Sequence, residues 1–205
     1  MPPRRRSNPL SLAVLACLSE RPMHPYEMGT TMRTRGQDQT IKLNYGSLYT
    51  VVESLARAGL IEAGDTAREG RRPERTVYSI TEEGRREFVD WLSELLRTPA
   101  KEYSQFEAGL TLMGGLPPAD VTALLEERCH KLEFEVARLK TTIDVALREG
   151  APHVFLVEVE HQRAMCEADL EFTRKLVHDI ASGSIDGLDE WASFHATDAS
   201  PGEDT

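Results

Sequence analysis

The sequence lacks the features that mark a disulfide-rich, membrane-spanning or catalytic protein. It has only three cysteines, Cys17, Cys129 and Cys166, which are widely spaced and form no CxxC pair. This odd number argues against a disulfide scaffold and favours a reducing cytoplasm. No run of residues approaches the roughly 20 apolar positions of a membrane-spanning helix. The chain also has neither a nucleophile elbow nor a phosphate-binding glycine loop, so we expect no enzyme activity.

Aromatic residues are sparse, at 6% of the chain, which disfavours a surface rich in aromatic side chains. The hydrophobic fraction of 40% still supports a packed core, and 205 residues allow one domain or two small ones. Basic charge is scarce overall, because 24 lysines and arginines face 34 acidic residues, for a net charge of −10. Residues 1–98 nevertheless hold 15 basic and 13 acidic residues, so the excess of acidic residues lies entirely after them. This split predicts two parts, of which the first suits an anionic partner.

The N-terminus has two interpretations. Arg4–Arg6 precede the apolar run LSLAVLACL at 10–18, which imitates a signal peptide, and cleavage before Cys17 would give an exported lipoprotein. The alternative is a buried helix, with Asn8 as its N-cap and Pro9 at its first position. Because the apolar run is short for a signal peptide, we expect the buried helix.

Residues 8–98 predict a winged helix-turn-helix. Cap residues, stop signals and apolar periodicity place its elements. We expect helices at 9–20, 25–35 and 44–61 and short strands at 61–66 and 75–80. A fourth helix is expected to be capped by Thr81 and to end at Thr98.

The helix at 44–61 has an outer face suited to DNA. Its buried stripe is formed by Leu48, Val51, Val52 and Leu55. The opposite face carries Gly46, Ser47, Thr50, Glu53, Ser54 and Arg57, with Tyr49 at its flank. A solvated helix usually carries lysine, glutamate and glutamine instead. Small hydrogen-bonding residues let the end of a helix enter the major groove of DNA.

The loop between the two strands is basic. Arg68, Arg71, Arg72 and Arg75 lie at or beside its tip, where they would contact the DNA backbone or minor groove. Arg4–Arg6 would add a basic arm.

Beyond Pro99 the sequence predicts acidic helices. We expect them at 104–114, 117–148 and 153–181, followed by a short piece containing Leu188, Trp191 and Phe194. The expected apolar stripe of the helix at 117–148 contains Val121, Leu125, Leu132, Val136, Leu139, Ile143 and Leu147, interrupted by Arg128. The expected apolar face of the helix at 153–181 contains Met165, Phe172, Leu176 and Ile180.

A rival hypothesis from another class is a metal- or ligand-binding helical bundle whose winged domain docks a protein. Glu127-x-x-His130 and Glu158-x-x-His161 form half of a di-iron bundle arrangement. Two further inward-facing glutamates would be needed, so we expect no metal and no cofactor.

The two tryptophans, Trp91 and Trp191, also have two interpretations. Each either belongs to a core or interface, or contributes to a flat aromatic wall that binds an apolar effector between subunits.

The sequence resembles the PadR family of bacterial transcriptional regulators. The resemblance rests on NPLSLAVLACLSERPMHPYEM at the start, YGSLYTVVESLARAGLI in the third helix and VYSITEEGRREF after the wing, and covers residue 8 to about 96. It implies a homodimer, joined through its C-terminal helices, that binds an inverted repeat and releases DNA when a small aromatic or cationic compound binds. It also implies DNA contacts from Tyr26, Ser47, Tyr49 and the wing arginines.

The chain departs from the family pattern at two places. Thr50 stands where the family often has proline, and the wing reads Gly70-Arg71-Arg72-Pro73-Glu74-Arg75-Thr76 rather than the common Gly-Arg/Pro-x-Arg-Lys. The full set of expected DNA contacts is Tyr26, Asn44, Gly46, Ser47, Tyr49, Thr50, Arg57, Arg71, Arg72 and Arg75.

These observations combine into one prediction. We expect a mostly α-helical cytoplasmic protein, with a winged helix-turn-helix domain at 8–98, a helical dimerisation and effector domain at 99–195, and a disordered tail at 196–205. The predicted function is a sequence-specific, ligand-responsive repressor. Its predicted partners are double-stranded operator DNA, a second copy of the chain and a small aromatic or hydrophobic effector.

Overall fold

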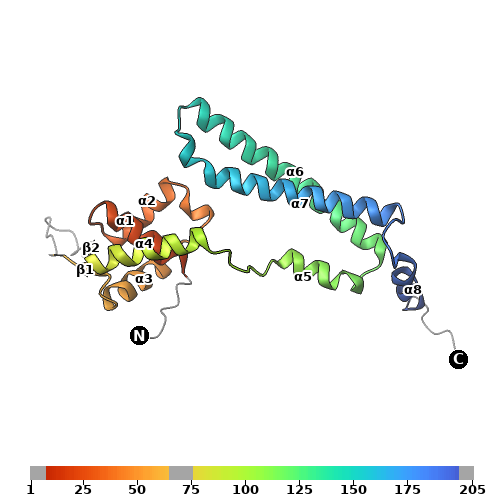
Figure 1. The fold of residues 1–205 in the computed structure, drawn as a ribbon, viewed down its shortest axis with the longest axis horizontal. Helices are drawn as coiled ribbons and strands as arrows, with labels where there is room; N and C mark the ends of the chain where they lie inside the picture. The colour runs from red at the N-terminus through yellow and green to blue at the C-terminus, as the bar shows by residue number, and fades with distance from the viewer. Residues whose placement is uncertain (1–7, 65–75, 199–205) are drawn as a thin grey trace. The chain divides into compact units, whose positions relative to one another are not determined.

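The computed structural model describes residues 8–64 and 76–198. The chain divides into two compact units, residues 1–102 and 103–205 (Figure 1). Each unit is described by itself.

The N-terminal unit is a set of helices packed around a short hairpin. Its elements are α1 (Pro9–Glu20), α2 (Pro25–Thr34), the 3₁₀ turn η1 (Gln37–Gln39), α3 (Tyr45–Arg57), β1 (Ile61–Ala63), β2 (Tyr78–Ile80) and α4 (Glu82–Arg97). These elements have the order predicted for a winged helix-turn-helix, and that fold is confirmed.

The first helix supplies much of the core of this unit. Asn8 caps α1, because its side-chain oxygen accepts a hydrogen bond from the Leu10 amide at 3.1 Å. The residues of the apolar run that imitates a signal peptide are largely buried here, and Val14 and Leu15 are completely enclosed. The predicted stripe of α3 is buried as well, at Leu48, Val51, Val52 and Leu55.

Helix α3 is shorter than predicted, whereas the first strand of the hairpin begins at residue 61 as expected. That helix was expected to reach residue 61, but α3 ends at Arg57. Gly59 then takes the left-handed conformation, with φ of 72°, which reverses the chain and frees Ile61 to begin β1. The two strands pair antiparallel in the register Ile61 to Ile80, Glu62 to Ser79 and Ala63 to Tyr78.

The other edge of β2 pairs with a segment that the sequence predicted as loop. Met23 and Tyr78 exchange two backbone hydrogen bonds, of 3.1 and 3.0 Å. This bridge anchors the turn between α1 and α2 to the hairpin, because it satisfies backbone groups that a two-stranded sheet would leave unpaired.

A close backbone approach fixes α4 against β1. Thr81 caps α4 as predicted, accepting a hydrogen bond from the Gly84 amide at 3.0 Å and donating to the Gly59 carbonyl at 2.8 Å. A Cβ atom at position 84 would lie 2.0 Å from the carbonyl oxygen of Leu60. Glycine is therefore required at this position by sterics alone.

The C-terminal unit is a long antiparallel helix pair with shorter helices at one end. Its elements are α5 (Gln105–Leu112), the 3₁₀ turn η2 (Met113–Gly115), α6 (Pro118–Arg148), the 3₁₀ turn η3 (His153–Phe155), α7 (Val157–Ala181) and α8 (Leu188–Asp198). Figure 1 shows α6 and α7 lying side by side, and ion pairs join them between Arg128 and Asp169 and between Arg174 and Glu133. Helix α8 continues past residue 196, where the sequence predicted the tail to begin.

The predicted apolar face of α7 is partly wrong. Met165 and Phe172 are more than half exposed, whereas Leu170 and Thr173 are buried. Thr173 can lie in this core because its hydroxyl donates to the Asp169 carbonyl at 2.7 Å, which satisfies its polar group within its own helix. A sequence pattern that counts threonine as polar excludes Thr173 from the buried face of α7 and so assigns that face to the wrong residues. On α6, Leu147 is likewise 47% exposed, although it belongs to the predicted stripe.

Candidate nucleic-acid interface

The N-terminal end of α3 is capped, and small residues follow Tyr45 in its first turn. The side-chain oxygen of Asn44 accepts a hydrogen bond from the Ser47 amide at 2.7 Å, so the cap satisfies one of the free amides of the first turn. Gly46 and Ser47 are both exposed. Helix ends of this kind carry a partial positive charge and attract phosphate groups.

The predicted outer face of α3 is exposed along its whole length. Tyr49 is 42% exposed, and Thr50 and Arg57 are also at the surface. The Thr50 hydroxyl donates to the Gly46 carbonyl at 3.0 Å, which leaves its methyl group and its oxygen lone pairs available to a ligand. Arg57 lies at the opposite end of α3, so the structure does not bring it together with Asn44, Gly46 and Ser47.

Helix α2 joins this surface through a stack of aromatic rings. Tyr26 is 56% exposed, and its ring stacks on that of Tyr45 with centroids 5.5 Å apart and planes 7° from parallel. The guanidinium of Arg33 lies over the Tyr45 ring of this stack, 4.5 Å from its centroid, and donates to the Tyr45 hydroxyl at 2.9 Å. The His24 ring packs edge-on against the Tyr49 ring, with centroids 6.4 Å apart. Tyr26 is thus held beside the exposed end of α3, as a joint DNA contact requires.

Sequence reasoning missed three residues of this surface, Arg33, Tyr45 and His24. Arg33 and Tyr45 are twelve residues apart, on different helices, and meet only because α2 packs closely on α3. A Cβ atom at Gly29 would lie 2.9 Å from the Tyr45 ring, so glycine on α2 permits this approach. The sequence signal was the glycine itself, in the middle of an otherwise regular helix.

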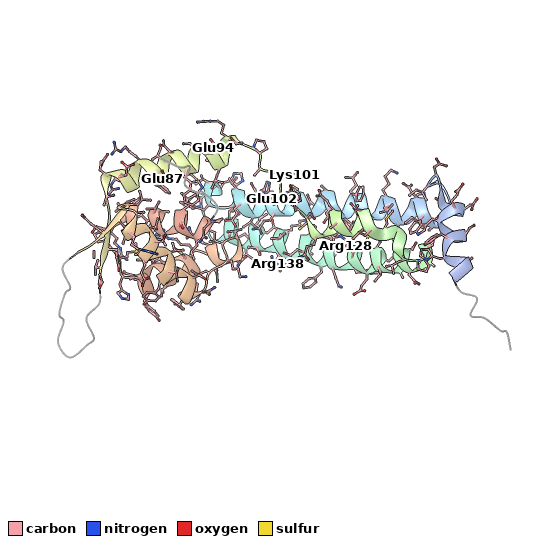
Figure 2. All side chains as sticks on the ribbon, turned by 90° about the horizontal axis from the view of Figure 1, so that it is seen from below. Glu87, Glu94, Lys101, Glu102, Arg128 and Arg138 are labelled. Carbon is pink, nitrogen blue, oxygen red and sulfur yellow. The ribbon has the colours of Figure 1, made fainter. Side chains whose placement is uncertain are left out.

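The charge around this end of the unit suits an anion. Arg33 is exposed, and its described contacts are with a neutral tyrosine rather than with a carboxylate. Acidic side chains also occur on these helices, at Glu53 on α3 and at Glu27 on α2, where Glu27 pairs with Arg21 at 2.5 Å; others lie on α4, where Figure 2 labels Glu87 and Glu94. The wing arginines Arg71, Arg72 and Arg75, and the basic arm Arg4–Arg6, lie outside the described residues.

The two candidate effector tryptophans lie in different units. Trp91 lies on α4 and is buried, at 6% exposed. Trp191 lies on α8, where its indole nitrogen donates to the Leu116 carbonyl at 2.8 Å. Their role in effector binding stays a prediction.

The structure gives no support to the rival metal-binding hypothesis. Glu127 is 62% exposed and pairs with Lys131 at 2.7 Å on its own helix. Within residues 8–64 and 76–198, no group of three or more histidine, cysteine or acidic side chains is placed to hold a metal ion. No helix in the same described ranges is long and apolar enough to cross a membrane.

The three cysteines are free thiols, as predicted. Cys17 and Cys129 are buried, and Cys166 is partly so. Burial raises the pKa of all three thiols above the ordinary value, because desolvation disfavours the thiolate. The thiolate is the reactive form, so this environment suits packing rather than catalysis.

Comparison with known proteins agrees with this geometry. Residues 14–90 match the family model described as the transcriptional regulator PadR-like family. No curated protein sequence matches the chain.

Solved structures with the same fold cover most of the chain. A Bacillus subtilis PadR structure in complex with operator DNA has a TM-score of 0.67 at 16% identity, covering 84% of this chain and 99% of that one. The same protein in complex with p-coumaric acid has a TM-score of 0.64 at 14% identity, with coverages of 84% and 95%. The PadR-like regulator BC1756 from Bacillus cereus has a TM-score of 0.56 at 18% identity, with coverages of 85% and 99%.

These likenesses show the fold, and the family model adds the class of protein. The winged helix, the exposed end of α3 and the match over residues 14–90 support one conclusion. This chain carries a PadR-like transcriptional regulator domain, and it is a transcription regulator with a DNA-binding fold rather than an enzyme.

Proposed function

We propose that this protein is a homodimeric, ligand-responsive repressor that binds an inverted-repeat operator. The observation that carries the proposal is the exposed, asparagine-capped end of α3, flanked by the stacked Tyr26 and Tyr45 rings. A helix end with small outer residues fits the major groove, where base edges present a distinct pattern of donors and acceptors.

Each residue of this surface has a role in the proposal. The amides of the first turn of α3 and the guanidinium of Arg33 hold phosphates. Ser47, Tyr49 and Thr50 face the base edges. Tyr26, Asn44, Gly46 and Arg57 border this contact, and Arg71, Arg72 and Arg75 of the wing extend it along the backbone.

The dimer is proposed to form through residues 99–195, with residues 8–98 as the DNA-binding domain. Large apolar side chains are exposed in the C-terminal unit, including Phe134, Phe155 and Phe172, each at least half exposed. Exposed apolar surface of this kind marks a protein–protein contact. A twofold dimer places two α3 helices on successive major grooves, about 34 Å apart, which explains why the operator would be an inverted repeat.

An effector is proposed to release the DNA. A protein of the same fold was solved with p-coumaric acid, which is an aromatic acid. An effector that prefers one angle between the two DNA-binding domains shifts their spacing, and the lost register lowers affinity for the operator. The cytoplasm is the compartment in which this role is expected.

Selection of random duplex DNA by the purified protein tests the proposal. The experiment is run at about 150 mM salt, where non-specific phosphate binding is suppressed. We expect an enriched inverted repeat with half-sites about one helical turn apart. Recovery of unenriched DNA by a protein that is monomeric in light scattering would refute both the operator and the dimer.

Two variants then separate phosphate contacts from sequence reading. The double variant Arg71→Ala, Arg72→Ala should weaken binding equally on all sequences and reduce the salt slope by about 1 for each lost phosphate contact. Tyr49→Ala should weaken binding to the selected repeat more than binding to random DNA. An unchanged salt slope would exclude the wing from the complex, and equal losses on both DNAs would exclude Tyr49 from sequence reading.

A further inference from the structure

One exposed arginine of the N-terminal unit is held by a tyrosine instead of a carboxylate. Arg33 lies on the last turn of α2, and its Nη1 donates to the Tyr45 hydroxyl at 2.9 Å. Its guanidinium carbon is 4.5 Å from the centroid of the same ring, within the range of about 6 Å for a cation–π contact. In the part of the chain that the structure describes, the polar contacts of Arg33 are with this tyrosine.

The Tyr45 ring fills the gap between Tyr26 and Arg33 on α2. These two residues are seven positions apart, so they lie on the same face of the helix, about 10 Å apart along its axis. Gly29 lies between them, and a Cβ atom there would be 2.9 Å from the Tyr45 ring. The ring therefore contacts Tyr26 at one end of this gap and Arg33 at the other, although it belongs to α3.

This packing orders the Arg33 side chain and leaves most of its donors available. A guanidinium has five N–H donors in a planar fork, and the Tyr45 hydroxyl accepts from one nitrogen of that fork. A phenol carries no charge at neutral pH, so the positive charge of Arg33 is not neutralised by its partner. A carboxylate at the same place would compete with an incoming phosphate.

Arg35 provides a contrast only two residues further along the chain. Its Nη1 and Nη2 donate to the two carboxylate oxygens of Glu20, at 2.5 and 2.8 Å. This bidentate pair satisfies both the charge and the geometry of the guanidinium. Arg35 is thus committed to a contact within the protein, whereas Arg33 is ordered but still able to bind an anion.

Arg33 is held next to the first turn of α3, because Tyr45 is the first residue of that helix. The Tyr45 and Gly46 amides have no acceptor within their own helix, since no turn precedes them. An anion near this turn would meet both amide donors and a guanidinium. The acidic residues of α2 and α3 interfere little, because Glu27 is already paired and Glu53 is eight residues further along α3.

We infer that Tyr45 is a positioning residue for DNA binding, which holds the Arg33 guanidinium ready for a backbone phosphate beside the first turn of α3. Tyr45 acts through Arg33 and does not itself contact DNA. The inference rests on the proposed function, which gives Arg33 a phosphate contact. It adds the residue on which this contact depends and the chemical group, the phenol hydroxyl, that orients it.

The gain from this arrangement is entropic. A free arginine loses rotamer freedom when it is ordered at an interface, and that loss lowers affinity by about two- to tenfold for a flexible side chain. Arg33 has lost much of this freedom before DNA arrives, because the Tyr45 hydroxyl and ring already hold it. Removal of the hydroxyl should restore the cost.

The salt dependence of DNA binding tests the contact at Arg33. Fluorescence anisotropy measures the affinity of the full-length protein for labelled duplex DNA between about 50 and 200 mM salt. Arg33→Gln should weaken binding to all sequences and lower the salt slope by about 1. Arg35→Gln is the matched control, since it makes the same substitution two residues away, and its slope should stay parental because Glu20 occupies that guanidinium. Equal slopes in the two variants would overturn the inference.

A double-mutant cycle tests the positioning role of Tyr45. Tyr45→Phe keeps the ring and removes the hydroxyl, so affinity should fall by about two- to tenfold. In the Arg33→Gln background the same substitution should have little further effect, because the hydroxyl acts only through Arg33. Equal losses in both backgrounds would show that the hydroxyl contacts DNA directly. That result, or parental affinity in Tyr45→Phe, would overturn the positioning role.

Arg33→Lys and thermal unfolding exclude a purely structural role. Lysine keeps the charge, so the salt slope should stay parental, but a compact ammonium lacks the planar fork and affinity should still fall. A slope in Arg33→Lys as low as that of Arg33→Gln would contradict a phosphate contact. If Arg33→Gln lowered the Tm and left the salt slope parental, the stack would only tie α2 to α3 and the inference would fall.

The inference and the proposed function fail in different ways. A parental protein that binds no duplex DNA would overturn both. An enriched operator, together with equal salt slopes for Arg33→Gln and Arg35→Gln, would overturn this inference and leave the proposed function standing.

Discussion

Replacement of Asn44 separates the structural role of the α3 cap from its role at DNA. The Asn44 side chain accepts a hydrogen bond of 2.7 Å from the Ser47 amide. Asn44→Ala removes this bond and should cost about 1 kcal/mol of stability, the usual effect of losing a cap. For a unit of about 100 residues this corresponds to a Tm about 4 °C lower.

Asn44→Asp keeps the accepting oxygen and adds a negative charge at the positive end of the helix. Stability should therefore stay within about 0.5 kcal/mol of the parent or rise. On the proposed complex the same carboxylate would lie close to DNA phosphates. Two like charges about 4 Å apart repel by at least about 1 kcal/mol even in water, so affinity should fall by at least about fivefold.

Thermal unfolding by circular dichroism measures the first effect, and fluorescence anisotropy with the selected operator measures the second. The expected result is opposite orders: alanine is worse for stability, and aspartate is worse for DNA. Parental affinity in the aspartate variant would refute the placement of this helix end against phosphate. Equal affinity losses in both variants would instead indicate that the amide itself contacts a base.

Two further predictions concern stability and thiol reactivity. Gly84→Ala should destabilise the N-terminal unit by about 2 kcal/mol or more, because the new Cβ atom would collide with the Leu60 carbonyl. Gly109→Ala should be neutral or up to about 1 kcal/mol stabilising, because a Cβ atom there meets open space and alanine has the better helix propensity. Equal Tm values for the two variants in thermal unfolding would contradict this account. Native Cys17 should resist iodoacetamide at about pH 8, because burial raises its pKa, and should react only on unfolding. As the pH rises, the thiol ionises in the unfolded chain before it ionises in the folded protein. The contribution of Cys17 to stability is therefore present below the ordinary thiol pKa and declines above it. Rapid labelling of Cys17 in the native protein, measured by mass spectrometry, would contradict its burial.

Much of the N-terminal unit could be predicted because its signals are local. Asn8 and Thr81 each cap the helix that follows them, as expected from residue type and position. Asn44 caps α3, which was predicted to begin at that residue. The apolar stripe of α3 was also predicted correctly, since helical periodicity alone decides which side faces the core. The end of α3 was predicted wrongly, because the helical sequence pattern continues past Gly59, whereas the left-handed conformation of Gly59 ends the helix.

The C-terminal helices were predicted in position but less well in orientation. Stop signals at Gly150 and Pro152 separate α6 from α7 as expected. The buried face of α7 was misjudged, because Thr173 satisfies its hydroxyl within the helix and packs like an apolar residue. A polar label in a sequence pattern does not record whether a hydrogen-bond partner is available.

The candidate DNA surface also combines residues that the sequence predicted with contacts that only the structure reveals. Sequence alone determined the small outer residues of α3, because helical faces depend on neighbours within a few positions. Only the tertiary structure decided that Tyr26, Tyr45 and Arg33 form one stack, because that contact depends on how closely α2 approaches α3. The apolar pocket lined by Phe106, Met113 and Arg128 is likewise a property of packing, since its lining residues come from α5, η2 and α6.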